Sequence, residues 1–309
     1  MKTIWLLVYF PLYIATSPCV ARAQGYPGRD ADVEASRRDT SLIIADIRPK
    51  LFGDLRPSEA AIYEAISFDV SDEDKIMNAY AYRSSGARRI TFTEAMGRAI
   101  KLNVDAMLIE QFYQKPRFLG DYLYYVCTRY AMNADRSRRG LSPERIASPY
   151  ERVHWADRDL REFYSEKDVN SARAKLLGGS FAFLLAHEVA HQVLGHVDNP
   201  TRDIDVRRQL ETDADAWAIN LLVEKNVSPV SGIVPMLFFY YTTQHPVASE
   251  IYKDHPADVK RMLAMFTGLN DRLPKFRASI EASGQSYDDV RKTIGQALVL
   301  VKQEIDEDR

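Results

Sequence analysis

Residues 181–196 read FAFLLAHEVAHQVLGH and contain the pattern His-Glu-x-x-His. On an α-helix, residues four apart lie on one face with about 6 Å of rise between them. His187 and His191 can therefore bind the same metal ion, and neutral imidazole nitrogens suit zinc. Glu188 follows the first histidine, where a general base can reach a metal-bound water. The stretch predicts a zinc site on a helix.

A pair of histidines on a helix also arises through ordinary packing. The apolar run before His187 has no polar face, however, which indicates that this helix is buried. Two buried imidazoles and a buried carboxylate need polar partners. A metal ion and the groups around it supply such partners, and the context therefore favours zinc.

A catalytic zinc ion usually has three protein ligands and one open position. A helix expected at residues 207–225 can return antiparallel to the first one and carries Glu211, 20 residues after His191. Asp215, one turn further, is placed to hydrogen-bond a zinc-bound histidine. The alternative is that Glu211, Asp213 and Asp215 are solvated acids near a helix start, where acids are favoured. Asp213 fits that alternative best, and we predict Glu211 as the third ligand.

These residues resemble those of the gluzincin metallopeptidases, and more narrowly the HtpX and CAAX-prenyl-protease type. The resemblance implies that His187, His191 and Glu211 bind one zinc ion and that Glu188 is the catalytic general base. It implies that Asp215 orients a ligand histidine. The implied fold is α+β and mostly helical, a zincin-like peptidase domain with a small antiparallel sheet and a buried zinc-binding helix.

Outlying features extend the resemblance from about Ile76 to Arg261. His196 stands five residues past the second ligand, and His255-Pro256 precedes Arg261 by six residues from the histidine. The resemblance implies that His255 is catalytic, near the reaction centre, and that Arg261 supports that region. A packing or capping role for His255 is the alternative.

Two further histidines compete for these roles. On a helix that continues through residue 196, His196 lies about 140° round from His191, which disfavours it as a fourth ligand. His245 also precedes a proline, but Ile251 stands where the arginine is expected, and we interpret His245 as structural.

Two short strands, Ile76–Tyr82 and Arg89–Thr93, are predicted upstream, joined by a hairpin loop. The resemblance implies that Arg89–Thr93 pairs with an extended substrate. We expect a helix from Pro57 to Phe68 and the motif helix over Val169–His196.

The N-terminus has one positive charge, an apolar run and Ala21-Arg22-Ala23, which predict a secretory signal peptide cleaved near Ala23. An uncleaved membrane anchor is the alternative. The predicted division is 1–23 signal peptide, 24–57 N-terminal leader, 58–270 peptidase domain with an insertion at about 112–167, and 271–309 C-terminal helical extension. The insertion and the extension depart from the family pattern.

Charge and cysteine content limit the classes of function that the chain can have. Loss of Lys2 and Arg22 with the signal peptide changes the net charge of the 309-residue chain from −2 to −4, a balance that does not indicate nucleic acid. Only Cys127 remains, which excludes an intramolecular disulfide. No later apolar run reaches the roughly 20 residues of a spanning helix. We expect a soluble chain, periplasmic or secreted.

The residues together predict a soluble zinc endopeptidase that hydrolyses extracytoplasmic polypeptides and binds one Zn²⁺ per chain. The alternative is a zinc-stabilised binding or quality-control module with little or no turnover. Glu188 favours the enzyme, because a structural zinc site needs no general base and usually closes with a fourth protein ligand.

Overall fold

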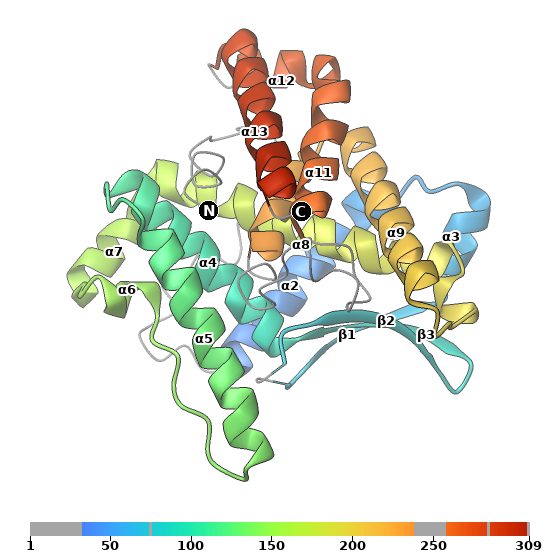
Figure 1. Cartoon of the computed structure of the whole chain (residues 1–309), viewed down its shortest axis with the longest axis horizontal. Coiled ribbons are helices and arrows are strands. Elements are labelled where there is room, and N and C mark those ends of the chain that lie inside the picture. Colours follow the sequence, from blue (N-terminus) through green and yellow to red (C-terminus); the bar gives the residue numbers. More distant parts are fainter. Residues whose placement is uncertain (1–32, 74–75, 238–257, 283–284, 308–309) are drawn as a thin grey trace.

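Helix α8 (Lys167–Val193) runs through the middle of the molecule, with the sheet on one side and the C-terminal helices on the opposite side (Figure 1). The computed structural model describes residues 33–73, 76–237, 258–282 and 285–307. Every residue from Phe181 to Ala190 is buried, which confirms the prediction of a buried helix. The described residues are mostly helical and form one small sheet, as the α+β prediction requires.

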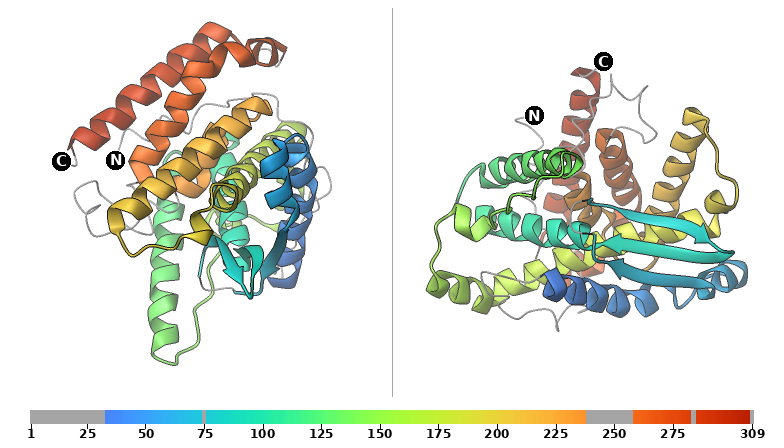
Figure 2. Two further views of the ribbon diagram at one scale, coloured as in Figure 1. Left: turned by 90° about the vertical axis from the view of Figure 1, so that its right-hand side faces the viewer. Right: turned by 90° about the horizontal axis from the view of Figure 1, so that it is seen from below.

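The other helices surround α8 (Figure 2). Those before it are α2 (Val33–Phe52), α3 (Pro57–Glu64), α4 (Glu94–Phe112), α5 (Phe118–Arg138), α6 (Pro149–Arg152) and α7 (Asp157–Ser165). Those after it are η1 (His196–Asp198), α9 (Ile204–Glu224), η2 (Pro229–Gly232), α11 (Asp258–Arg272), η4 (Leu273–Phe276), α12 (Arg277–Ala282) and α13 (Tyr287–Glu307). Among the described helices, none combines the length and apolar character that crossing a bilayer requires.

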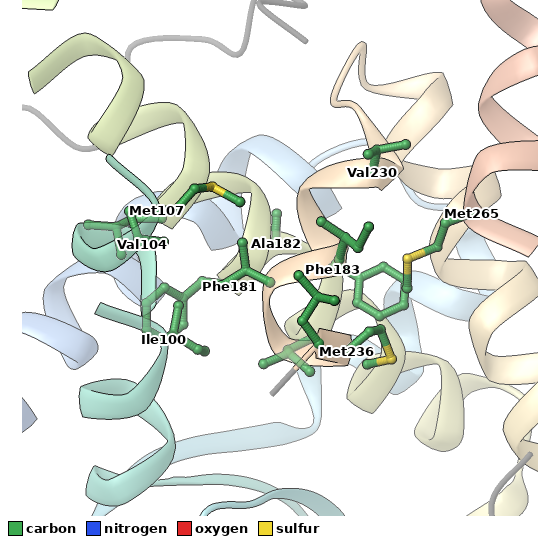
Figure 3. Close-up of a cluster of buried hydrophobic side chains, with 14 of the residues drawn as sticks. Ile100, Val104, Met107, Phe181, Ala182, Phe183, Val230, Met236 and Met265 are labelled. Atoms are coloured by element: carbon green, nitrogen blue, oxygen red, sulfur yellow. The ribbon is translucent and has the colours of Figure 1, made fainter. Parts of the chain in front are cut away.

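Aromatic side chains of α8 fix it from two sides. Figure 3 shows Phe181 directed toward Ile100 of α4, while Phe183 points toward Met236 and Met265. Both phenylalanines are fully buried. Burying a side chain of this size stabilises the fold by about 1.5–3 kcal/mol. The residues that follow on the helix, His187 and beyond, are therefore held in place by an apolar core.

The sheet contains three strands, β1 (Ile66–Ser71), β2 (Ala79–Ser84) and β3 (Ala87–Thr93), in the order β1-β3-β2. Strands β2 and β3 form the predicted hairpin. Ser85 and Gly86 between them have φ values of 50° and 83°. Two consecutive positive φ values are typical of a type I′ turn, whose twist matches that of the strands it joins.

Strand β1 corrects two predictions. The helix expected over Pro57–Phe68 ends at Glu64, and the sheet is mixed, because β1 pairs parallel to β3 from Ile66↔Arg88 to Ser71↔Thr93. Ile66 and Val70 are buried, and the backbone of β1 is paired with that of β3. Burial of these side chains and complete backbone pairing with β3 stabilise residues 66–71 as a strand more than continuation of the helix would.

The central position of β3 corrects a third prediction. Because β1 and β2 occupy its two edges, Arg89–Thr93 has no edge left for an extended substrate. The two outer edges of the sheet belong to β1 and β2. The Thr93 N–H donates to the Asn78 carbonyl at 2.9 Å, and hydrogen-bonded pairs alternate along an antiparallel ladder. The backbone groups of Ala79 and Ala81 therefore face away from β3.

The segment predicted as an insertion forms α5, α6 and α7. A buried polar cluster joins α6 and α7 to α4 and to the start of α8. Arg173 Nε lies 2.6 Å from Asp105 Oδ1, the Tyr164 hydroxyl lies 3.3 Å from Asp105 Oδ2, and the Tyr150 hydroxyl donates to the same carboxylate. His154, exposed and at φ 57°, lies between α6 and α7.

Helices α2 and α4 cross closely at Gly97. A Cβ added there would lie 2.2 Å from Thr40 Oγ1. We expect Gly97→Ala to destabilise the fold by about 1–3 kcal/mol, because the helices must separate. Gly295→Ala in α13 is the matched control, since nothing lies within 4 Å of its Cβ position. The control is expected to gain up to about 1 kcal/mol from helix propensity. Urea denaturation checks both, and equal stability of the two variants would contradict the close crossing.

Candidate active site

Two histidines of α8 and one glutamate of α9 converge at one point. His187 Nε2 lies 3.1 Å from His191 Nε2 and 3.2 Å from Glu211 Oε2, and His191 Nε2 lies 3.4 Å from Glu211 Oε1. Ligand atoms about 2.0–2.1 Å from a tetrahedral zinc ion stand about 3.3 Å apart. The three residues could therefore hold a metal ion. Their donor set, two imidazoles and one carboxylate, fits zinc.

The turn between α8 and α9 brings Glu211 to the histidines. Helix α8 ends at Val193, and Gly195 follows with φ 76°, the left-handed conformation that commonly ends helices. Helix α9 begins under an N-cap, since Asp203 Oδ1 accepts hydrogen bonds from the next helical N–H groups at 2.9 and 3.2 Å. Helices α8 and α9 then pack along each other.

Gly195 also corrects the prediction that the motif helix continues through residue 196. His196 lies in η1, and its Nδ1 stands 3.0 Å from His191 Nδ1. Burial and the charge of His191 lower the pKa of His196. The ring of His196 therefore contacts the nitrogen of His191 that is directed away from Glu211. His196 is outside the set of three converging ligand atoms.

Asp215 lies one turn beyond Glu211, behind His187. Asp215 Oδ1 is 2.9 Å from His187 Nδ1, and Arg261 of α11 grips the same carboxylate, with Nε 2.6 Å from Oδ2 and Nη2 2.8 Å from Oδ1. All three side chains are buried. Burial raises the pKa of Asp215, but the charge and hydrogen bonds of Arg261 outweigh it and keep the pKa well below its usual range.

The same contacts act on His187. Burial by itself lowers the pKa of His187, but the hydrogen bonds and charges of Asp215 and Glu211 raise it to about 10. Asp215 thus fixes the orientation of the ring with Nε2 directed at the meeting point. This is the arrangement in which a carboxylate holds a metal-binding histidine.

Glu188 is buried beside the converging residues. Burial raises the pKa of Glu188, and the charge of Glu211 raises it further. The two histidines and a hydrogen bond from the Ala81 backbone lower the pKa, but the net shift is upward. A carboxylate with a raised pKa is better matched to accepting a proton near neutral pH. Glu188 belongs to the wall of a cavity of about 370 Å³.

The cavity lies between β2, α8 and α9. The described residues lining it include Asn78, Ala79, Tyr80 and Ala81 of the hairpin, the three converging residues, Glu188, His196 and Arg261. No described lining residue comes from the segment 112–167. The open edge of β2 and the converging side chains therefore share one cavity.

Other residues of the sequence analysis have separate positions. Asp213 is exposed and accepts a hydrogen bond from Gln209 Nε2 at 2.8 Å, which fits a solvated acid. His255 and His245 lie outside the described residues. Gln192 belongs to none of the predicted site residues; it is fully buried beside His191 and bonds to the sheet. The sequence signal for Gln192 is a polar residue in a stretch whose other residues are apolar or belong to the site.

Comparison with known proteins finds one family model that matches slightly less than half of the chain. Residues 125–277 match the family model Peptidase U49. The matched region contains the three converging residues, Glu188, Asp215 and Arg261, and it does not contain the sheet. No curated protein and no solved structure matches the chain significantly. The family match supports a proteolytic function and therefore a polypeptide substrate.

Proposed function

We propose that the protein is a zinc-dependent endopeptidase that hydrolyses extracytoplasmic polypeptides. The observation that carries the proposal is the meeting of His187, His191 and Glu211 within 3.4 Å of one another, with Glu188 in the same cavity. Three ligands with a neighbouring carboxylate are typical of catalytic zinc sites. The peptidase family match supports the same reaction.

The residues of the site would have separate roles in metal binding, ring orientation and proton transfer. His187, His191 and Glu211 would hold the zinc ion, and Asp215 would keep the His187 ring in position. When bound, zinc supplies a Lewis acid that polarises a carbonyl oxygen and makes water more acidic. Glu188 would accept the proton of the attacking water and later give it to the leaving amine, because its raised pKa suits both steps.

The open edge of β2 is the element suited to bind the substrate backbone. Ala79 and Ala81 line the cavity with backbone groups that face away from β3, the Ala81 N–H toward Glu188, and their small side chains leave room for a second chain. An extended peptide that adds a strand to this edge gains main-chain hydrogen bonds without a required sequence. The proposed substrates are therefore extended or unfolded segments of polypeptides. The extracytoplasmic location rests on the signal peptide predicted at residues 1–23.

Metal removal tests the proposal. We expect the purified chain to contain one zinc ion, to cleave an unfolded protein such as reduced casein, to lose this activity with a chelator, and to regain it when zinc is added. Glu211→Gln should weaken zinc binding by more than about 100-fold, because even partners of zinc ligands contribute 10–100-fold. Zinc titration followed by metal analysis measures the change.

The matched control is Glu281→Gln, an exposed glutamate of α12. It should bind zinc and cleave casein as the wild type does. Activity that survives complete metal removal would contradict the zinc peptidase. A chain that holds one zinc ion but cleaves no unfolded substrate would instead be the binding module.

A further inference from the structure

Gln192 follows the ligand His191 on α8 but points at the sheet. Its side chain is fully buried. Nε2 donates to the Arg89 carbonyl at 2.9 Å and to the Tyr82 carbonyl at 3.3 Å, and Oε1 accepts from Arg88 Nη1 at 3.1 Å. Both ends of the amide are therefore bonded to the hairpin.

The two carbonyls belong to facing residues of different strands. Tyr82 of β2 pairs with Arg89 of β3, four steps along the ladder from the hydrogen-bonded pair Asn78–Thr93. Since hydrogen-bonded pairs alternate, Tyr82 and Arg89 also exchange backbone bonds. One amide group thus spans both strands of the hairpin at a point where their spacing is fixed.

Asp198 of η1 adds a second attachment. Its carboxylate accepts from Arg83 Nη1 of β2 at 2.7 Å and from Arg88 Nη2 of β3 at 2.6 Å. Arg88 Nη1 also donates to the Gln192 backbone carbonyl at 3.3 Å. The hairpin is therefore joined to the end of α8 by Gln192, Arg88 and Asp198, which we call the hairpin anchor.

We propose that the hairpin anchor sets the edge of β2 at the correct distance from Glu188 and the ligand histidines, and so aligns an extended substrate for cleavage. This inference rests on the proposed function. Gln192 is separated from the cavity and acts through β2, and it is therefore a positioning residue. A substrate held on β2 inherits any shift of that strand, and a misplacement of 1 Å at a reacting centre can cost about 100-fold in rate.

Gln192→Leu tests the inference, because leucine fills a similar volume without bonding to the carbonyls. Zinc content should remain at the wild-type value. We expect kcat/KM to fall at least tenfold for a peptide of eight or more residues and distinctly less for a blocked dipeptide, which has few backbone groups to pair with β2. A purely structural role would lower stability without this dependence on substrate length. Gln303→Leu, on the exposed face of α13, is the control.

Hydrogen exchange provides a readout that does not need activity. The backbone amides of β2 should exchange several-fold faster in Gln192→Leu than in the wild type, while those of α9 should not change. If the wild type cleaves nothing but β2 exchange rises, the proposed function fails and the anchoring of the hairpin holds. Wild-type exchange together with wild-type cleavage of the long peptide would overturn the inference.

A second variant guards against misfolding of the first. Asp198→Asn removes the charge that both arginines bind and lies at the surface, so the core is untouched. It should show the same dependence on substrate length, with Asp271→Asn in α11 as its exposed control. If Asp198→Asn cleaves long and short peptides at wild-type rates with wild-type exchange of β2, the proposed role of the anchor is wrong.

Discussion

Replacing Glu188 by glutamine should lower the rate of peptide hydrolysis by about 10²–10⁴-fold while the chain keeps its zinc. Glutamine has nearly the same shape but cannot accept the proton of the attacking water. Glu188 contributes none of the three converging ligand atoms. Its replacement by glutamine should therefore leave the metal in place. Steady-state kinetics on an unfolded protein, beside metal analysis of the same preparation, measure both quantities.

Glu162→Gln is the control for this experiment, since Glu162 is an exposed glutamate of α7. It should leave both zinc content and rate unchanged. Equal loss of zinc and activity in Glu188→Gln would show that Glu188 belongs to the structure of the site and has no role as a base. Retention of full activity would require another base.

Replacing Asp215 by alanine should destabilise the fold by about 3–5 kcal/mol, because the buried Arg261 guanidinium loses its bidentate partner. Asp215 and Arg261 are 4% and 8% exposed, so water cannot replace the lost contacts readily. Chemical denaturation in the presence of a chelator measures this change free of zinc linkage. Zinc affinity should also fall about 10–100-fold, because the His187 ring loses the group that orients it.

The double variant Asp215→Ala/Arg261→Met separates the two effects. Removing both charges should restore part of the stability, because the Arg261 guanidinium no longer stays buried without Asp215, although the buried Asp258 also loses a neighbouring positive charge. The zinc affinity should stay low, since His187 still lacks its carboxylate. A single variant Asp215→Ala that unfolds at the wild-type denaturant concentration would show that the pair contributes nothing to the fold.

The sequence predicted the helices better than the sheet. The absence of a polar face before His187 indicated a buried helix, and α8 is buried. Residues 66–71, Ile-Ser-Phe-Asp-Val-Ser, alternate apolar and polar side chains, the pattern of a strand, but the helix predicted from Pro57 to Phe68 overlaps the first three of them. The pairing of β1 with β3 could not be predicted, because no local signal specifies a partner strand far along the chain.

The site shows a similar division. Glu211 and Asp215 were predictable because a spacing of four places both on one face of α9, toward the histidines. The role of Gln192 was not predictable, because its Nε2 donates to backbone carbonyls, and every residue type has the same backbone carbonyl. The position of His196 depends on the left-handed conformation of Gly195, and a glycine after a helical run is a known signal for the end of a helix.

The apolar packing of α8 has a consequence for the maturation of the protein. Phe181 and Phe183 lie in the core, and Leu185 and Val189 beside the two histidines are fully buried as well. These contacts involve no metal, so under the proposed function the helix and its histidine pair should assemble first and bind zinc afterwards. In small zinc domains the order is reversed, because the ion itself drives folding. Under the proposed function, a scarcity of zinc would leave a folded protein without activity, and the return of the metal would restore that activity.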